Sequence, residues 1–174
     1  MHSELSTPQV QSMPHPIDRD EHRATVQTCV WLDEHDWLHR IFKSPHNTSP
    51  RFRLPDLLSA CVSMALADST TQQQMVEIIL TRPTRPDAKC ERRSCHIFPT
   101  QFEQVMDAHR APWNRFPNPM FELDHITTAC VTVVTAWPVA DARVLAQARA
   151  NLLARTRASA STGTGTCTSG LSTN

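Results

Sequence analysis

The chain has 174 residues and no formal net charge, with 40% hydrophobic and 20% charged residues. These values exclude a collagen, a coiled-coil rod and a fully disordered chain. All three glycines lie at or after position 163. A phosphate-binding loop, a dinucleotide-binding fingerprint and a nucleophile elbow all need glycine, so residues 1–162 hold none of these enzyme sites. The same lack of glycine disfavours tight hairpins and hence an all-β domain.

Both ends of the chain are predicted to be disordered, because their composition cannot bury a core. Residues 1–23 are polar and acidic, and residues 158–174 consist largely of Ser, Thr, Ala and Gly. Residues 1–22 lack the apolar run of a secretory signal, and the longest nearly uncharged apolar stretch, residues 126–140, is too short to span a bilayer. We therefore expect a cytoplasmic protein with reduced cysteines and no membrane partner.

A candidate internal repeat lies between the two ends. Residues 51–67 (RFRLPDLLSACVSMALA) and residues 120–136 (MFELDHITTACVTVVTA) are identical at six of 17 aligned positions. Flanking residues recur in the same order on both sides, among them Asn47 with Asn114 and Arg82 with Arg155. The pattern predicts two tandem repeat units, which span residues 24–82 and 99–157 and are joined by a basic linker, residues 83–98.

Each repeat unit is predicted to hold three short helices. Helical spacing of apolar residues, capping patterns and prolines place the expected helix starts near positions 33, 56, 70, 100, 124 and 138. An extended Pro-x-Phe-x-Leu segment precedes the second helix of each unit. Two copies are too few for an open solenoid, so the predicted fold is a mainly α, compact domain whose two units pack face to face about a pseudo-two-fold axis.

The linker carries candidate metal ligands. Cys90, Cys95 and His96, with His109 further along the chain, could form a Cys2His2 zinc set, although the cysteine spacing is at the wide end of the usual range. The alternative is a polar linker with incidental thiols, and on balance we predict no metal and no cofactor. The neighbouring arginines of the linker would lower a thiol pKa, which makes Cys95 the candidate reactive cysteine.

Arginine and aromatic residues make up the candidate binding surface. Arginine beside aromatic rings suits stacking on nucleobases and contact with phosphate, but the same composition suits a proline-rich loop packed over a core. The six candidate binding residues are Arg92, Arg93, Arg110, Trp113, Arg115 and Phe116.

A strand–helix–helix unit used twice is similar to the ribbon-helix-helix DNA-binding proteins. Membership would place Arg51 and Arg53 on a β-ribbon that enters the major groove. The matching second strand would present Glu122 to phosphate, and the prolines at positions 50, 55 and 119 would limit strand pairing. The sequence therefore does not assign the chain to this family.

The predicted function is that of a non-enzymatic accessory or regulatory protein that binds a protein partner, because a scaffold without glycine loops suits binding better than catalysis. Two alternatives stay open. The first is a DNA-binding regulator that uses the arginine-rich surface, for which nucleic acid is the partner. The second is a zinc- or thiol-dependent enzyme built around the four candidate metal ligands.

Overall fold

The computed structural model describes residues 25–84, 89–114 and 119–162, which form a mainly helical fold as predicted. Within these ranges no helix combines the length and the apolar character that a bilayer crossing requires. The described elements, in chain order, are β1 (Val26–Trp31), α1 (Leu32–Lys43), α2 (Leu54–Leu66), α3 (Thr70–Thr81), β2 (Arg92–Ile97), α4 (Pro99–Arg110), α5 (Leu123–Thr135) and α6 (Ala140–Thr162), with short 3-10 turns at Arg82–Thr84 and Pro112–Asn114.

All six expected helices are present, and local sequence explains where they begin. In α1, Trp37, Leu38 and Ile41 recur at helical spacing and are buried. The helix α4 begins with Pro99, whose fixed φ suits the first helical position. In α2, the Asp56 carboxylate accepts a hydrogen bond from the backbone N–H of Arg53, which satisfies one of the free donors at the helix start.

The structure differs from the prediction in three stretches and leaves part of the ends undescribed. Strand β1 precedes the first predicted helix, where no strand was expected. Strand β2 lies within residues 83–98, the predicted linker, so this segment is not merely a connection. Residues 158–162 belong to the end of α6 instead of the predicted tail. The remaining residues predicted to be disordered, 1–23 and 163–174, lie outside the described residues.

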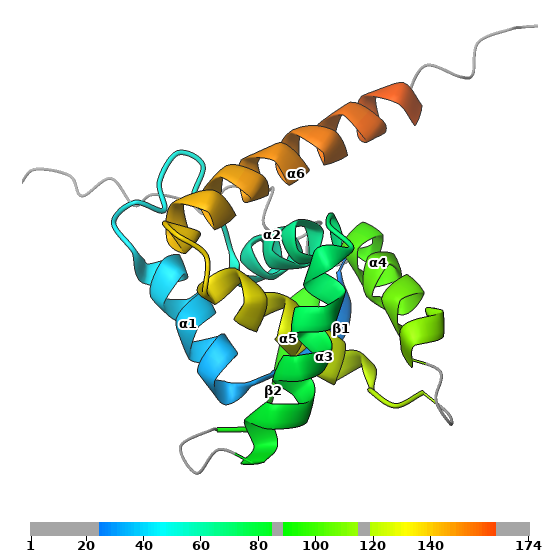
Figure 1. The fold of residues 1–174 in the computed structure, drawn as a ribbon. Coiled ribbons are helices and arrows are strands. Elements are labelled where there is room, and N and C mark those ends of the chain that lie inside the picture. The colour runs from blue at the N-terminus through cyan, green and yellow to red at the C-terminus, as the bar shows by residue number, and fades with distance from the viewer. Residues whose placement is uncertain (1–24, 85–88, 115–118, 163–174) are drawn as a thin grey trace, which may run out of the picture.

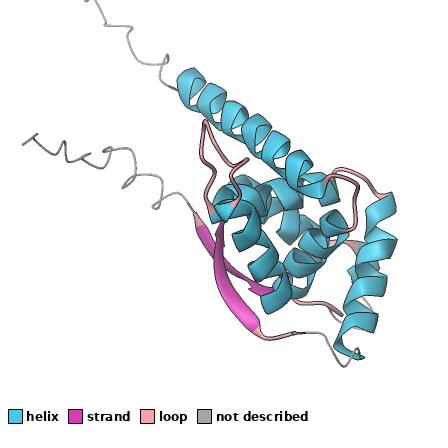
Figure 2. Ribbon diagram, turned by 90° about the vertical axis from the view of Figure 1, so that its left-hand side faces the viewer, coloured by secondary structure: helices cyan, strands magenta, loops and turns pink. Residues whose placement is uncertain are grey.

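The two strands pair with each other and form a small antiparallel sheet. In the register, Thr28 lies opposite Cys95, with Val26 opposite Ile97 on one side and Val30 opposite Arg93 on the other. Val30 and Ile97 are fully buried, because this face of the sheet packs against the helices. Figure 2 shows the two strands along one edge of the helical body.

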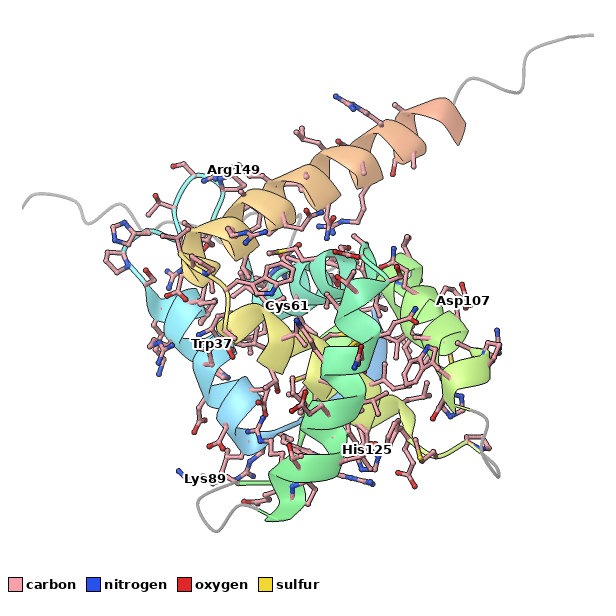
Figure 3. All side chains as sticks on the ribbon, viewed as in Figure 1. Trp37, Cys61, Lys89, Asp107, His125 and Arg149 are labelled. Atoms are coloured by element: carbon pink, nitrogen blue, oxygen red, sulfur yellow. The ribbon has the colours of Figure 1, made fainter. Side chains whose placement is uncertain are left out.

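The helices α2 and α5 form the centre of the molecule and pack against each other. The long helix α6 crosses over α2, whereas α3 packs against α5 (Figure 1). Cys61 of α2 and Cys130 of α5 are both fully buried, and Figure 3 shows Cys61 in the middle of the packed side chains. Each half of the chain therefore places its third helix on the central helix of the other half.

Candidate nucleic-acid interface

The outward face of the two-stranded sheet carries a group of polar side chains. Because side chains alternate across a strand, the residues neighbouring the buried positions point away from the helices. Gln27, Arg92, Ser94 and His96 are exposed, and Cys29 is half-buried. Trp31 alternates to the same side but is buried, so the exposed part of β1 ends before it. We call these five residues the ribbon face.

The side chains of the ribbon face interact across the two strands. Gln27 Nε2 donates a hydrogen bond to Ser94 Oγ over 3.0 Å. At the adjacent end of the sheet, Thr25 Oγ1 and His96 Nδ1 are 3.3 Å apart, within hydrogen-bonding distance. These groups can donate and accept hydrogen bonds, and their polar atoms stand on one exposed surface.

Arg92 is oriented by two carboxylates at the start of α5. Arg92 Nη2 lies 2.8 Å from Glu122 Oε2, and Arg92 Nε lies 2.6 Å from Asp124 Oδ2. The hydrogen bond to Glu122, together with the charge of Asp124, holds the pKa of the Arg92 guanidinium above its ordinary value. Arg92 therefore stays charged and is held at one end of the ribbon face.

Each strand is anchored to the opposite half of the chain where the strand passes into a helix. The backbone N–H of Trp31 donates to Thr128 Oγ1 of α5 over 3.2 Å. The backbone N–H of Phe98 donates to Ser59 Oγ of α2 over 3.1 Å. Both hydrogen bonds are buried, so water competes little with them.

An arginine lies over each of these two aromatic residues. The guanidinium carbon of Arg82 is 5.3 Å from the centre of the Trp31 ring, and that of Arg155 is 3.7 Å from the centre of the Phe98 ring. Both arginines also pair with carboxylates, because Arg82 contacts Asp33 and Glu34, and Arg155 contacts Asp56. These contacts fix the ends of the sheet on the helical body.

A buried asparagine closes the loop after the first helix of each half. Asn47 Oδ1 accepts from the backbone N–H of Phe52 over 2.8 Å, and its Nδ2 donates to the carbonyls of Phe42 and Phe52. Asn114 Oδ1 accepts from the backbone N–H of Phe121 over 2.8 Å, and its Nδ2 donates to the carbonyls of His109 and Phe121. The two asparagines thus make the same set of three hydrogen bonds.

An open groove of about 660 Å³ runs beside β1, between α4 and the start of α5. Phe102 and His109 of α4 line it together with Gln27 and Arg92 of the sheet. The groove therefore brings His109, a candidate metal ligand, into the same region as Arg92, a candidate binding residue.

The four candidate zinc ligands are not assembled into a metal site in the part of the chain that the structure describes. Cys95 is buried on the inner face of β2, whereas the next residue, His96, is exposed on the ribbon face. Among the described residues, which include Cys90 and His109, no cluster of three or more His, Cys, Asp or Glu side chains is placed to hold a metal ion. Burial, together with the charge of Cys29, raises the pKa of the Cys95 thiol to about 11, which is opposite to the lowering expected from the linker arginines.

The candidate binding residues occupy several places. Arg92 belongs to the ribbon face, while the adjacent Arg93 lies opposite the buried Val30 and pairs with Glu91 at 3.2 Å. Arg110 is the last residue of α4. Trp113 is partly buried, and its ring centre is 6.3 Å from that of Phe121. The remaining two candidates, Arg115 and Phe116, lie outside the described residues.

Sequence reasoning missed three members of the ribbon face, Gln27, Cys29 and Ser94. The segment Val26-Gln27-Thr28-Cys29-Val30 does alternate between apolar and polar residues in part, which is a period-two signal typical of a strand. His96 was named for metal binding instead of for this surface.

No family model, no curated protein and no solved structure matches the chain.

Proposed function

We propose that this protein binds double-stranded DNA by placing the ribbon face in the major groove. The observation that carries the proposal is an antiparallel pair of strands whose inner face is fixed to the helices and whose outer face presents exposed polar side chains. The major groove of B-DNA is about 12 Å wide and admits a two-stranded β-ribbon.

The side-chain chemistry of the ribbon face suits the edges of base pairs. A glutamine such as Gln27 can pair with adenine N6 and N7. The Nη2 and Nε atoms of Arg92 contact Glu122 and Asp124, so its guanidinium would donate to guanine O6 or N7 through Nη1. Serine hydroxyls such as that of Ser94 donate or accept, and therefore contact several bases. These groups extend from one surface, which is how β-ribbon proteins read DNA sequence.

We also infer that the chain consists of two related strand–helix–helix–helix units that pack about a pseudo-two-fold axis. Cys95 lies 67 positions after Thr28 in the sequence and is also paired with Thr28 in the sheet. An offset of 67 residues therefore matches the two strands to each other, and the pair Thr28 and Cys95 lies at the centre of the sheet. The same offset relates Asn47 to Asn114, which make matching hydrogen bonds. One chain then supplies both strands of a ribbon that an ordinary dimer builds from two chains.

The order of strands and helices supports a similarity to ribbon-helix-helix proteins. The ribbon, however, is formed by other segments than those that the sequence comparison had suggested. The strands are residues 26–31 and 92–97 instead of the segments around Arg53 and Glu122. The prolines at positions 50, 55 and 119 lie outside these strands, so they do not interrupt the pairing. The objection based on strand pairing therefore no longer applies.

The apolar surface gives less support to a protein partner. That reading needs a contiguous apolar patch near Trp113, whose ring instead packs against the core. The large apolar side chains that are exposed among the described residues lie on separate segments: Leu80, Met120, Val139 and Leu153. Single exposed apolar residues are normal on a protein surface.

The test is a fluorescence-anisotropy titration of mixed-sequence duplex DNA at about 50 and 200 mM salt. We expect binding that weakens by roughly a hundredfold or more at the higher salt, because protein–phosphate contacts release counterions. The double variant Q27A/S94A should bind any preferred site more weakly, whereas the control Q73A/Q74A, which removes two exposed glutamines of α3, should not. Absence of binding at both salt concentrations would refute the proposal.

A further inference from the structure

We infer that a single chain reads a non-palindromic DNA site, because the two ends of the ribbon face present different side chains to the two halves of that site. The inference rests on the proposed function, because it specifies which class of duplex the ribbon face recognises. It follows from the distribution of side chains about the centre of the sheet.

The centre of the sheet lies at the pair Thr28 and Cys95. The residue before the central position of one strand corresponds to the residue before the central position of the other strand, and the same holds for the residues after it. On the outer face, these corresponding residues differ in chemistry. Gln27 corresponds to Ser94, and Cys29 corresponds to His96. In a ribbon made from two identical chains these positions would carry identical residues, so the face would be symmetric and would match a palindrome.

The two halves of the ribbon face therefore offer different hydrogen-bonding groups. On one side of the central pair, Gln27 and His96 lie opposite each other and present an amide, which favours adenine, and an imidazole. On the other side, Cys29 and Ser94 lie opposite each other and present a thiol and a hydroxyl, and the guanidinium of Arg92, which favours guanine, lies beyond them. Two half-sites of different base composition satisfy these groups better than two copies of one half-site.

The segments that flank the ribbon are asymmetric in charge as well. Arg155 contacts both Asp56 in the first turn of α2 and the ring of Phe98, so the start of α2 lies beside one end of the sheet. The residues before that turn include Arg51 and Arg53.

The start of α5 lies beside the other end of the sheet and is acidic. Its Glu122 and Asp124 contact Arg92, which is opposite Trp31 in the register. One flank of the ribbon thus attracts the phosphate backbone more strongly than the other, which favours one orientation of the chain on the duplex.

The experiment is selection of bound sequences from a random duplex library with the full chain, followed by anisotropy on the selected site. We expect a selected motif without two-fold symmetry and a complex of one chain per duplex in analytical ultracentrifugation. Duplexes in which either half-site is repeated as a palindrome should bind about tenfold more weakly, because several base pairs of one half no longer match.

A variant that makes the strands alike tests the same inference independently. In S94Q/H96C the outer face of β2 gains the residues of β1 at both corresponding positions, and both changes are on the exposed side of the sheet. We expect the preference of this variant to move toward a palindromic site, because both ends of its ribbon face present a glutamine opposite a cysteine. The control T48A, at an exposed loop position, should keep the original preference.

The outcomes separate the two proposals. A palindromic motif, or two chains per duplex, with DNA binding retained would overturn the asymmetric reading and leave the proposed function intact. No DNA binding by the full chain would overturn the proposed function itself. If S94Q/H96C loses the circular-dichroism spectrum of the parent, the motif symmetry and the stoichiometry of the unaltered chain decide the question.

Discussion

Replacing Asn47 with alanine should destabilise the protein substantially. The side chain of Asn47 satisfies the backbone N–H and the carbonyl of Phe52 through two buried hydrogen bonds, each 2.8 Å long. A third hydrogen bond, to the carbonyl of Phe42, is partly buried and can be replaced by water. Each buried group left without a partner costs about 1–3 kcal/mol, so we expect the free energy of unfolding to fall by roughly 3 kcal/mol. This is a large part of the ~5–15 kcal/mol that stabilises an ordinary domain.

Asn114 provides a matched comparison. Its side chain makes two buried hydrogen bonds to the backbone of Phe121, at 2.8 and 3.1 Å, and one partly buried hydrogen bond to His109. The two sites bury the same backbone groups, so N47A and N114A should lower the free energy of unfolding by amounts that agree to within about 1 kcal/mol. Equal losses are what the proposed relation between the two halves requires.

The assay is equilibrium unfolding in urea, followed by far-ultraviolet circular dichroism and by tryptophan fluorescence. Coincident transitions by the two probes justify a two-state analysis. The variant T48A is the control, because Thr48 is exposed and adjacent to Asn47. Its free energy of unfolding should stay within about 0.5 kcal/mol of the parent. Losses below about 1 kcal/mol for both asparagine variants would show that the loops do not depend on these side chains.

Two further predictions concern buried groups. Cys61 and Cys130 should resist alkylation in the folded protein while Cys29 reacts, because full burial blocks access to both thiols and raises their pKa, that of Cys130 to about 12. Peptide mapping after treatment with iodoacetamide at pH 8 checks this prediction, and rapid labelling of all three cysteines would contradict the packing. Replacing Arg82 with methionine should lower the free energy of unfolding, measured in urea, by about 3–5 kcal/mol, because it leaves the buried carboxylate of Glu34 without its cation. The double variant R82M/E34Q should recover part of that loss, and equal stability of R82M and the parent would refute the pairing.

The helices could be predicted because their signals are local. Trp37, Leu38 and Ile41 recur at helical spacing within one helix, and prolines mark nearby boundaries. The segment of α5 is rich in Thr and Val, yet it forms a helix because burial between α2, α3 and β1 outweighs its intrinsic strand preference.

The strands could not be predicted because their partner lies far along the chain. Only Cys95 and Ile97 of the six residues in β2 are buried, so the segment has the composition of a polar linker. Its stability comes from hydrogen bonds to β1 and from packing on α2, and neither is visible in a short window of sequence. The candidate site was predicted only in part for the same reason. Arg92 was selected for its charge, but the polar side chains across the sheet were not selected.

The pairing of β1 with β2 also constrains how the molecule folds. The strands are separated by the whole of the first three helices, so the sheet closes only after a long loop has been ordered. Because α3 packs on α5 and α6 packs on α2, neither half can cover its own apolar surface alone. A nascent chain that has emerged only as far as α3 therefore exposes both an unpaired strand edge and an uncovered central helix, and it stays open to association with other chains until the second half is synthesised.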